Sequence, residues 1–291
     1  MDEPTIPAPH PDPHRPTAFT PPPEACDAHC HIFGPAARFP FAPDRTYTPP
    51  DAGYEHFTAL QDRLGLSRAV FVQASCHGTD NSAMVDAIRR GGGRYAGVAM
   101  VDDSFTDRNL GALHDSGIRG VRFNFVAHLG GAPSMDEFWR IIDRVAPLGW
   151  HVVLHFDAVD LPTYADVLDR VPVPYVIDHL ARIDAARGLD QEPFARLCEL
   201  LRDERAWVKI SGAERLSATG PPGYADVVPF ARAVVDIAPD RILWGTDWPH
   251  PNVRQMPDDG DLVDVLAAFT PDEATRTKIL VDNPAKLYHF G

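Results

Sequence analysis

Five polar residues stand at the ends of apolar runs and carry the groups that hydrolytic chemistry uses. His29 and His31 are two residues apart, and His155, His179 and Asp247 close later runs of the chain. Alternate side chains of a strand face the same side, so both imidazoles of the His29-Cys-His31 run point one way. A lone histidine is usually a hydrogen-bonded core or rim residue, but four of them at run ends with an aspartate indicate a reaction centre.

Short β-branched runs that alternate with amphipathic segments would position these residues. Eight runs of strand character begin near residues 26, 69, 95, 120, 151, 175, 207 and 242. This alternation is typical of βα units and a parallel sheet. A capping box, Ser134-Met-Asp-Glu137, predicts the start of one helix, and residues 194–202 form another amphipathic segment. Eight such units, with no G-x-G-x-x-G after any run, predict a (β/α)8 TIM barrel whose carboxyl-terminal strand ends carry the site.

The length and composition favour a single domain with an arm in front of it. The chain has 291 residues, 44% of them hydrophobic, which is enough for one barrel core. Residues 1–23 contain nine of the 29 prolines and show no apolar periodicity. We therefore expect an extended or disordered arm over 1–23 and the barrel over 24–291.

Charge and cysteine content argue against several classes of partner. The formal net charge of −14 disfavours nucleic acids and anionic membranes, which need an extended basic face, but a few local arginines could still hold a small anion. No apolar run approaches the length of a membrane span, and the start of the chain is acidic and rich in proline. Four cysteines without a C-x-x-C pair suit a reducing compartment, so a cytoplasmic enzyme is expected. An oligomer is compatible with these features.

Five motifs together carry a resemblance to a known family. They are Asp27-Ala-His29-Cys-His31-Ile-Phe-Gly-Pro, Gln73-Ala-Ser75-Cys-His77-Gly-Thr, Arg122-Phe-Asn124-Phe, Ile177-Asp178-His179 and Trp244-Gly-Thr-Asp247-Trp-Pro-His250-Pro-Asn252. From about Pro21 to Tyr288 the chain resembles the amidohydrolase superfamily, and within it the lactonases of the 2-pyrone-4,6-dicarboxylate hydrolase group. The short H-x-H pattern is weak alone, whereas the ordered set is specific.

The resemblance implies a barrel hydrolase that opens a carboxylated or otherwise anionic lactone, of the pyrone-dicarboxylate or muconolactone type, in the breakdown of aromatic compounds. Water would attack the ester carbonyl. Asp247 matches the aspartate that activates water, and His29, His31 and His179 match histidines around the scissile carbonyl. The positions that match substrate-binding residues are Tyr47, Ser75, Arg122, Arg215 and Asn252. Arginine suits an acidic substrate because its planar fork binds a carboxylate through two hydrogen bonds.

Two positions depart from the pattern of that group. His128 replaces a second carboxylate-binding arginine, and a neutral imidazole is a poorer partner for a carboxylate, so the exact substrate stays open. His155 replaces a tyrosine. Metal-dependent members of the superfamily carry a histidine there, on the fifth strand, so His29, His31, His155 and Asp247 form a donor set for one divalent metal, with zinc expected. A metal-free mechanism, with Asp247 alone as general base, remains the alternative.

Three other functions compete with lactone hydrolysis. Related barrels use the same strand-end histidines and aspartate in metal-dependent decarboxylases and in lactone isomerases. A binding or structural module would require the converging His/Asp set to be accidental. Released carbon dioxide, or a product of unchanged mass, would distinguish the first two from hydrolysis.

Overall fold

Eight parallel strands form a barrel at the centre of the molecule, in a computed structural model that describes residues 3–126 and 132–290. In chain order they are β1 (Cys26–Cys30), β2 (Arg68–Val72), β3 (Tyr95–Ala99), β4 (Ile118–Asn124), β5 (His151–His155), β6 (Tyr175–Ile177), β7 (Ala206–Lys209) and β8 (Ile242–Leu243). Each strand pairs in parallel with the next one along the chain. Backbone bonds from Ala28 N to Trp244 O (2.9 Å) and from Asp247 N to His29 O (2.8 Å) close the ring between β8 and β1. The predicted (β/α)8 barrel is confirmed.

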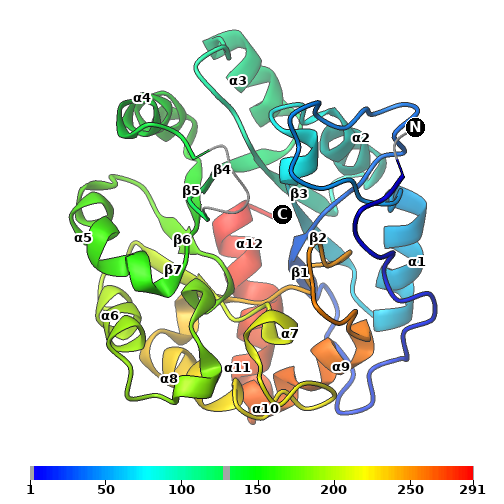
Figure 1. Cartoon of the computed structure of the whole chain (residues 1–291), viewed down its shortest axis with the longest axis vertical. Coiled ribbons are helices and arrows are strands. Elements are labelled where there is room, and N and C mark those ends of the chain that lie inside the picture. Colours follow the sequence, from blue (N-terminus) through cyan, green and yellow to red (C-terminus); the bar gives the residue numbers. More distant parts are fainter. Residues whose placement is uncertain (1–2, 127–131, 291) are drawn as a thin grey trace.

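Helices follow the strands and surround the barrel (Figure 1). They are α1 (Tyr54–Leu64), α2 (Ser82–Arg90), α3 (Asp107–Asp115), α4 (Met135–Val145), α5 (Leu161–Arg170), α6 (Glu192–Leu200), α7 (Ala213–Leu216), α8 (Val228–Ile237), α9 (Asp259–Asp264), α10 (Leu266–Phe269), α11 (Glu273–Thr277) and α12 (Asn283–Tyr288). Half of the predicted capping box of α4 is present: Glu137 N donates to Ser134 Oγ at 3.2 Å, but among the described residues the Glu137 side chain accepts no bond from Ser134 N. The second predicted helix is α6.

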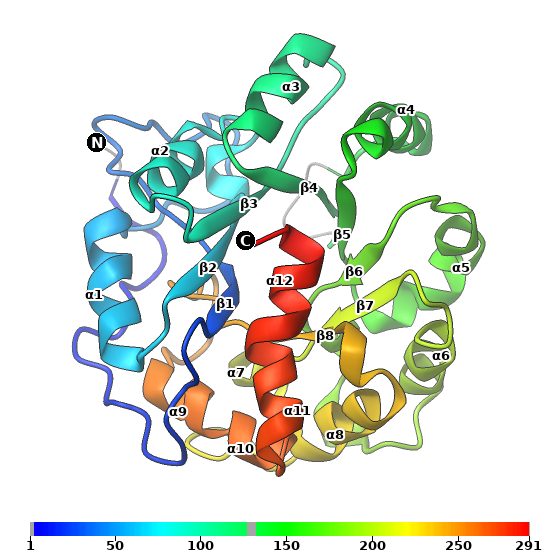
Figure 2. The ribbon, with the colours of Figure 1, turned by 180° about the vertical axis from the view of Figure 1, so that it is seen from behind.

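The apolar side chains of the strands alternate between two layers. In β2, Val70 and Val72 belong to the small cluster inside the barrel, whereas Ala69 and Phe71 pack outward with the helices. Tyr288 joins the inner cluster from α12, which lies across the end of the barrel opposite to α7 (Figure 2). The other end, where the strands finish, is thus left for the functional side chains.

The segment before β1 contains no helix or strand over residues 3–23, and it lies against the barrel domain. His14 N donates to Asp258 Oδ1 (3.0 Å), and Thr17 N donates to Asp264 Oδ1 (2.7 Å). Within the described ranges, no helix has the length and apolar character needed to cross a membrane.

Candidate active site

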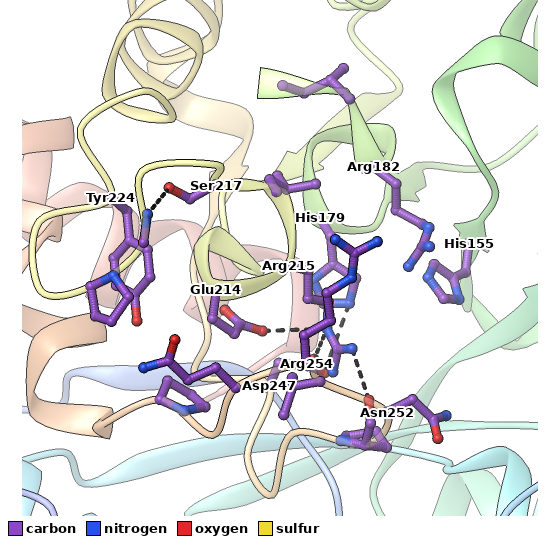
Figure 3. A pocket seen from close by; sticks show the side chains of 18 of the residues that line it. His155, His179, Arg182, Glu214, Arg215, Ser217, Tyr224, Asp247, Asn252 and Arg254 are labelled. Carbon is purple, nitrogen blue, oxygen red and sulfur yellow. Dashed lines mark hydrogen bonds and ion pairs between the residues drawn. The ribbon is translucent and has the colours of Figure 1, made fainter. Parts of the chain in front are cut away.

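A cavity of about 800 Å³ lies at the carboxyl-terminal strand ends, within the size range of small-molecule sites. The predicted site residues that line it are His31, Tyr47, Ser75, Arg122, His155, His179, Arg215, Asp247 and Asn252. His29 lies beneath the lining and is fully buried. His128 falls outside the described residues. Figure 3 shows Arg182 and His155 on one side of the cavity, with Glu214, Ser217 and Tyr224 on the other.

Asp247 occupies the centre of a ring of cationic and imidazole groups. Its Oδ1 lies 3.1 Å from His31 Nε2, 3.4 Å from His29 Nε2 and 3.8 Å from His179 Nε2. Its Oδ2 accepts hydrogen bonds from Nε (2.7 Å) and Nη2 of Arg215. Burial alone would raise the pKa of Asp247, but Arg215 and the histidines outweigh burial and hold this pKa well below its usual value. Asp247 is therefore a carboxylate at neutral pH.

His31 and His29 differ in what their second ring nitrogen meets. His31 Nδ1 lies 2.8 Å from Val72 O, which only accepts, so Nδ1 carries a proton and Nε2 faces Asp247. His29 Nδ1 lies 2.9 Å from Lys209 Nζ, while its buried Nε2 has no hydrogen-bond partner among the described residues. Burial and the charge of Lys209 lower the pKa of His29 well below its usual value, so its ring is neutral.

His179 is held from a strained stretch of backbone. Its Nδ1 lies 2.9 Å from Ser211 Oγ, and burial lowers its pKa to about 4. His179 and the three residues after it all have φ between 50° and 55°, and Asp247 has φ of 64°. The left-handed conformation costs about 1–2 kcal/mol for each non-glycine residue. Such strain is concentrated at functional sites in folded proteins, which supports a functional role for these two strand ends.

His155 lies at the end of β5 but outside the closest group of donor atoms. Both of its ring nitrogens are buried without a partner among the described residues, and its ring centroid is 5.6 Å from that of His179. Burial, together with Arg122 and His179, lowers the pKa of His155 well below its usual value. Ligand atoms of His29, His179 and Asp247, in contrast, lie within 4.8 Å of one another, as a metal site requires.

Beneath the cavity lies an ionic network that was not predicted. Lys209 Nζ is 3.1 Å from Asp178 Oδ1, and Arg122 Nε donates to Asp178 Oδ2 at 3.1 Å. Lys209 and Asp178 are both fully buried. The charges of Lys209, His29 and Arg122 outweigh burial and hold the pKa of Asp178 well below its usual value. A lysine inside the apolar run of β7 was the sequence signal for this network.

The cavity wall also contains polar residues that the motifs did not indicate: Arg182, Glu214, Tyr224 and Arg254. Both carboxylate oxygens of Glu214 are buried without a hydrogen bond to any described residue, and Oε1 lies 3.3 Å from Arg215 Nε. Glu214 directly precedes Arg215 and Arg254 follows Asn252 by two residues, so only proximity in sequence to predicted residues could have suggested them.

A parallel barrel that brings histidines and one aspartate together at its carboxyl-terminal strand ends is a TIM-barrel enzyme with its active site at the usual end of the barrel. The sequence profile of the amidohydrolase family matches residues 26–290, and the chain belongs to that family. It is 52% identical over 279 residues to the 2-pyrone-4,6-dicarboxylate hydrolase of Comamonas testosteroni, covering 93% of this chain and 92% of that protein.

Two further relatives agree with this assignment. The 4-sulfomuconolactone hydrolase of Rhizobium radiobacter is 44% identical over 277 residues, covering 94% of this chain and 92% of that protein. The crystal structure of a probable 2-pyrone-4,6-dicarboxylic acid hydrolase from Acinetobacter baumannii, with citric acid bound, is similar with a TM-score of 0.80 and 28% identity. That match covers 92% of this chain and all of the other. The predicted membership of the amidohydrolase superfamily, in its lactonase group, is confirmed.

Proposed function

We propose that this protein hydrolyses a lactone that carries anionic substituents, of the pyrone-dicarboxylate or sulfomuconolactone type, in aromatic catabolism. The observation that carries the proposal is the carboxylate of Asp247, oriented by Arg215 and facing three imidazoles at the wall of a cavity of small-molecule size. The names of two extensively similar relatives support the substrate class. All four cysteines are free thiols, which supports a cytoplasmic location as part of the proposal.

The donor set fits one divalent metal. His31 Nδ1 faces Val72 O, so Nε2 is the nitrogen turned towards Asp247 Oδ1, 3.1 Å away, and a cation could bind between these two atoms. Two ligands of a tetrahedral zinc ion lie about 3.3 Å apart. The distances from Asp247 Oδ1 to the histidine nitrogens, 3.1, 3.4 and 3.8 Å, are close to that value. We propose that His29, His31, Asp247 and a fourth histidine would hold the metal, with zinc expected.

The chemistry divides between the two oxygens of Asp247. Arg215 holds Oδ2, so Oδ1 is fixed towards the cavity and takes a proton from the attacking water. The water oxygen bonds to the ester carbonyl carbon, the ring C–O bond breaks, and the departing oxygen gains a proton. In the metal-free alternative, neutral imidazoles would donate hydrogen bonds to the oxyanion that forms on the carbonyl. A bound divalent metal would supply Lewis-acid polarisation of the carbonyl and make water more acidic.

The function is tested by product analysis with 2-pyrone-4,6-dicarboxylate and 4-sulfomuconolactone. We expect the mass of at least one of them to increase by one water. Asp247→Asn should lower kcat by a factor of about 10²–10⁴, because the general base is lost. Exposed Asp166 on α5 offers a control, and Asp166→Asn should leave kcat unchanged. Loss of carbon dioxide or a product of unchanged mass would instead identify a decarboxylase or an isomerase.

The fourth metal ligand is tested by metal analysis of two variants. The sequence pattern nominates His155 and the donor distances nominate His179. We expect His179→Gln to lose bound metal and His155→Tyr to retain it. The reverse result would assign the fourth position to His155. Full activity in chelator-treated protein that contains no transition metal would reject the metal and leave Asp247 as an unassisted general base.

A further inference from the structure

The cationic groups of the cavity are unequal in their freedom to bind an anion. Four arginines of the described residues line it: Arg122, Arg182, Arg215 and Arg254. Three of them already contact a carboxylate, in the pairs Arg122–Asp178, Arg182–Asp157 and Arg215–Asp247. Arg254 makes no hydrogen bond or ion pair with any residue in 3–126 or 132–290. In a chain with 41 acidic and 27 basic residues, an arginine that lines the cavity and lacks an acidic partner is notable.

Arg215 is poorly placed to bind an acid group of the substrate. Its Nε and Nη2 donate to Asp247, and its Nη1 donates to Pro251 O at 2.8 Å. Glu214 Oε1 lies 3.3 Å from the same Nε. Two carboxylates therefore surround one guanidinium, and a third at this point would be repelled. Arg215 orients the carboxylate of Asp247, so we infer that another cation binds the acid group that Arg215 was predicted to bind.

Arg122 retains free donors although it is paired. Only its Nε is used by Asp178, and its two terminal nitrogens make no hydrogen bond with any residue in the described part of the chain. Arg122 lies on β4, whereas Arg254 lies in the loop that follows β8. In a ring of eight strands taken in order, β4 and β8 are on opposite sides. The two arginines therefore line the cavity from elements that belong to opposite sides of the barrel.

We propose that Arg254 binds the second anionic group of a dianionic lactone, while Arg122 binds the first. This inference rests on the proposed function and deepens it, since it assigns to the site a substrate with two acid groups at separate positions of the ring. At position 128 this chain has a histidine where the related hydrolase has a carboxylate-binding arginine. Arg254 would supply the positive charge that this replacement removes. A planar fork on an exposed loop can bind carboxylate or sulfonate oxygens through two N–H groups.

The test uses anions that the enzyme cannot hydrolyse, so binding is measured without turnover. Calorimetry with isophthalate, which has two carboxylates on a planar ring, is compared with benzoate, which has one. We expect Arg254→Gln to weaken isophthalate binding about tenfold or more and benzoate binding less than about twofold. Arg254→Lys should recover part of the loss because it restores the charge. Arg202→Gln, at an exposed site before β7, is the matched control and should change neither affinity.

Kinetic measurements separate this inference from the function on which it rests. With a lactone that the wild type opens, Arg254→Gln should raise KM and leave kcat nearly unchanged, whereas Arg215→Gln should lower kcat. An Arg254→Gln variant that loses no affinity for isophthalate, or loses the same factor for benzoate, would overturn the inference even if the wild type is a lactonase. If the wild type opens no lactone but isophthalate binding shows the expected difference, the two-point anion site stands and the proposed function is wrong.

Discussion

A fully buried lysine connects the strand framework to the imidazoles of the site. Lys209 is 0% exposed and its Nζ contacts both His29 Nδ1 and Asp178 Oδ1. A lysine is almost never fully buried without charged partners, so its presence in the apolar β7 run indicates a buried counter-charge. The identity of that partner could not be predicted, because Asp178 follows a different strand and meets Lys209 only in the folded barrel.

Replacing Lys209 should destabilise the protein more than an exposed lysine would. Lys209→Met leaves Asp178 with one of its two cationic partners, and breaking a buried ion pair costs about 3–5 kcal/mol. We expect the free energy of unfolding in urea to decrease by that order. Lys286→Met, at an exposed position of α12, is the control and should have an effect below about 1 kcal/mol.

A double substitution checks the reason for the Lys209 effect. Asp178→Asn removes the charge that Lys209 neutralises, so the Lys209→Met/Asp178→Asn protein should be more stable than the sum of the two single losses predicts. Strictly additive losses, or a Lys209→Met protein of wild-type stability, would show that the pair is not coupled.

At the scale of elements, the strands were predictable and their ends were not. Apolar alternation placed all eight strands near their observed starts, but β8 contains only two residues, Ile242 and Leu243. The chain then turns through left-handed conformations, including φ of 64° at Asp247 and 60° at His250. Neither residue is a glycine, so their residue types did not predict a left-handed backbone conformation. The direction of the site side chains therefore had to come from the structure.

The junction of β8 and β1 depends on a missing side chain at Gly245. A Cβ there would lie 2.3 Å from the backbone N of His29 and 2.7 Å from Asp27 Oδ1. Asp27 also accepts a bond from Thr246 Oγ1 at 2.6 Å, which ties the two strand ends together. We expect Gly245→Ala to destabilise the protein by about 1–3 kcal/mol or more and to lower activity, because His29 must move.

Gly111 provides the matched control for that substitution. It lies in α3, and a Cβ at Gly111 would meet no atom within 4 Å. Gly111→Ala should leave activity unchanged and raise stability by up to about 1 kcal/mol, through helix propensity. Thermal unfolding and kcat of both variants check the pair. Equal behaviour of the two would mean that β8 does not approach β1 as closely as described.

At the scale of the whole molecule, the sequence predicted the residues that stand in motifs, at strand ends or at positions matched by the family resemblance. Several of the predicted residues that line the cavity stand in the five motifs, whereas Tyr47, His155 and Arg215 came from the strand ends and from the resemblance over the whole chain. The βα alternation predicted the barrel. Arg254, in the loop after β8, and Glu214, in the short helix α7, were missed because only the folded barrel shows which side chains lie opposite them. The role of His128 stays a prediction, since it lies outside the described residues.

The arm before β1 should contribute to stability and leave the chemistry intact. None of the described arm residues lines the cavity, yet His14, Thr17 and Ala18 bond to Asp258 or Asp264 around α9. We expect deletion of residues 2–18 to leave kcat within about twofold of wild type. Thermal unfolding should report a lower Tm, by about 2–4 °C for each kcal/mol lost. A large loss of turnover would show that the arm supports the active site.

The contribution of the arm should also depend on pH in a defined direction. Burial lowers the pKa of His14, but hydrogen bonds to Asp258 and Asp264 outweigh it and raise this pKa above 6.5. A raised pKa means that the His14 contribution is complete below pH 6.5 and is lost as the pH rises through the folded value. Burial raises the pKa of Asp264, but hydrogen bonds from Ala18 and Thr17 outweigh burial and lower this pKa. The Asp264 contribution is therefore lost only as the pH falls below 3.8.

The stability difference between full-length and truncated protein should thus be largest between about pH 4 and 6.5 and decline towards pH 9. His14→Gln in the full-length chain should abolish the decline of this stability difference above pH 6.5. A stability difference that stays constant from pH 6 to 9 without that substitution would show that His14 does not hold the arm through its charge.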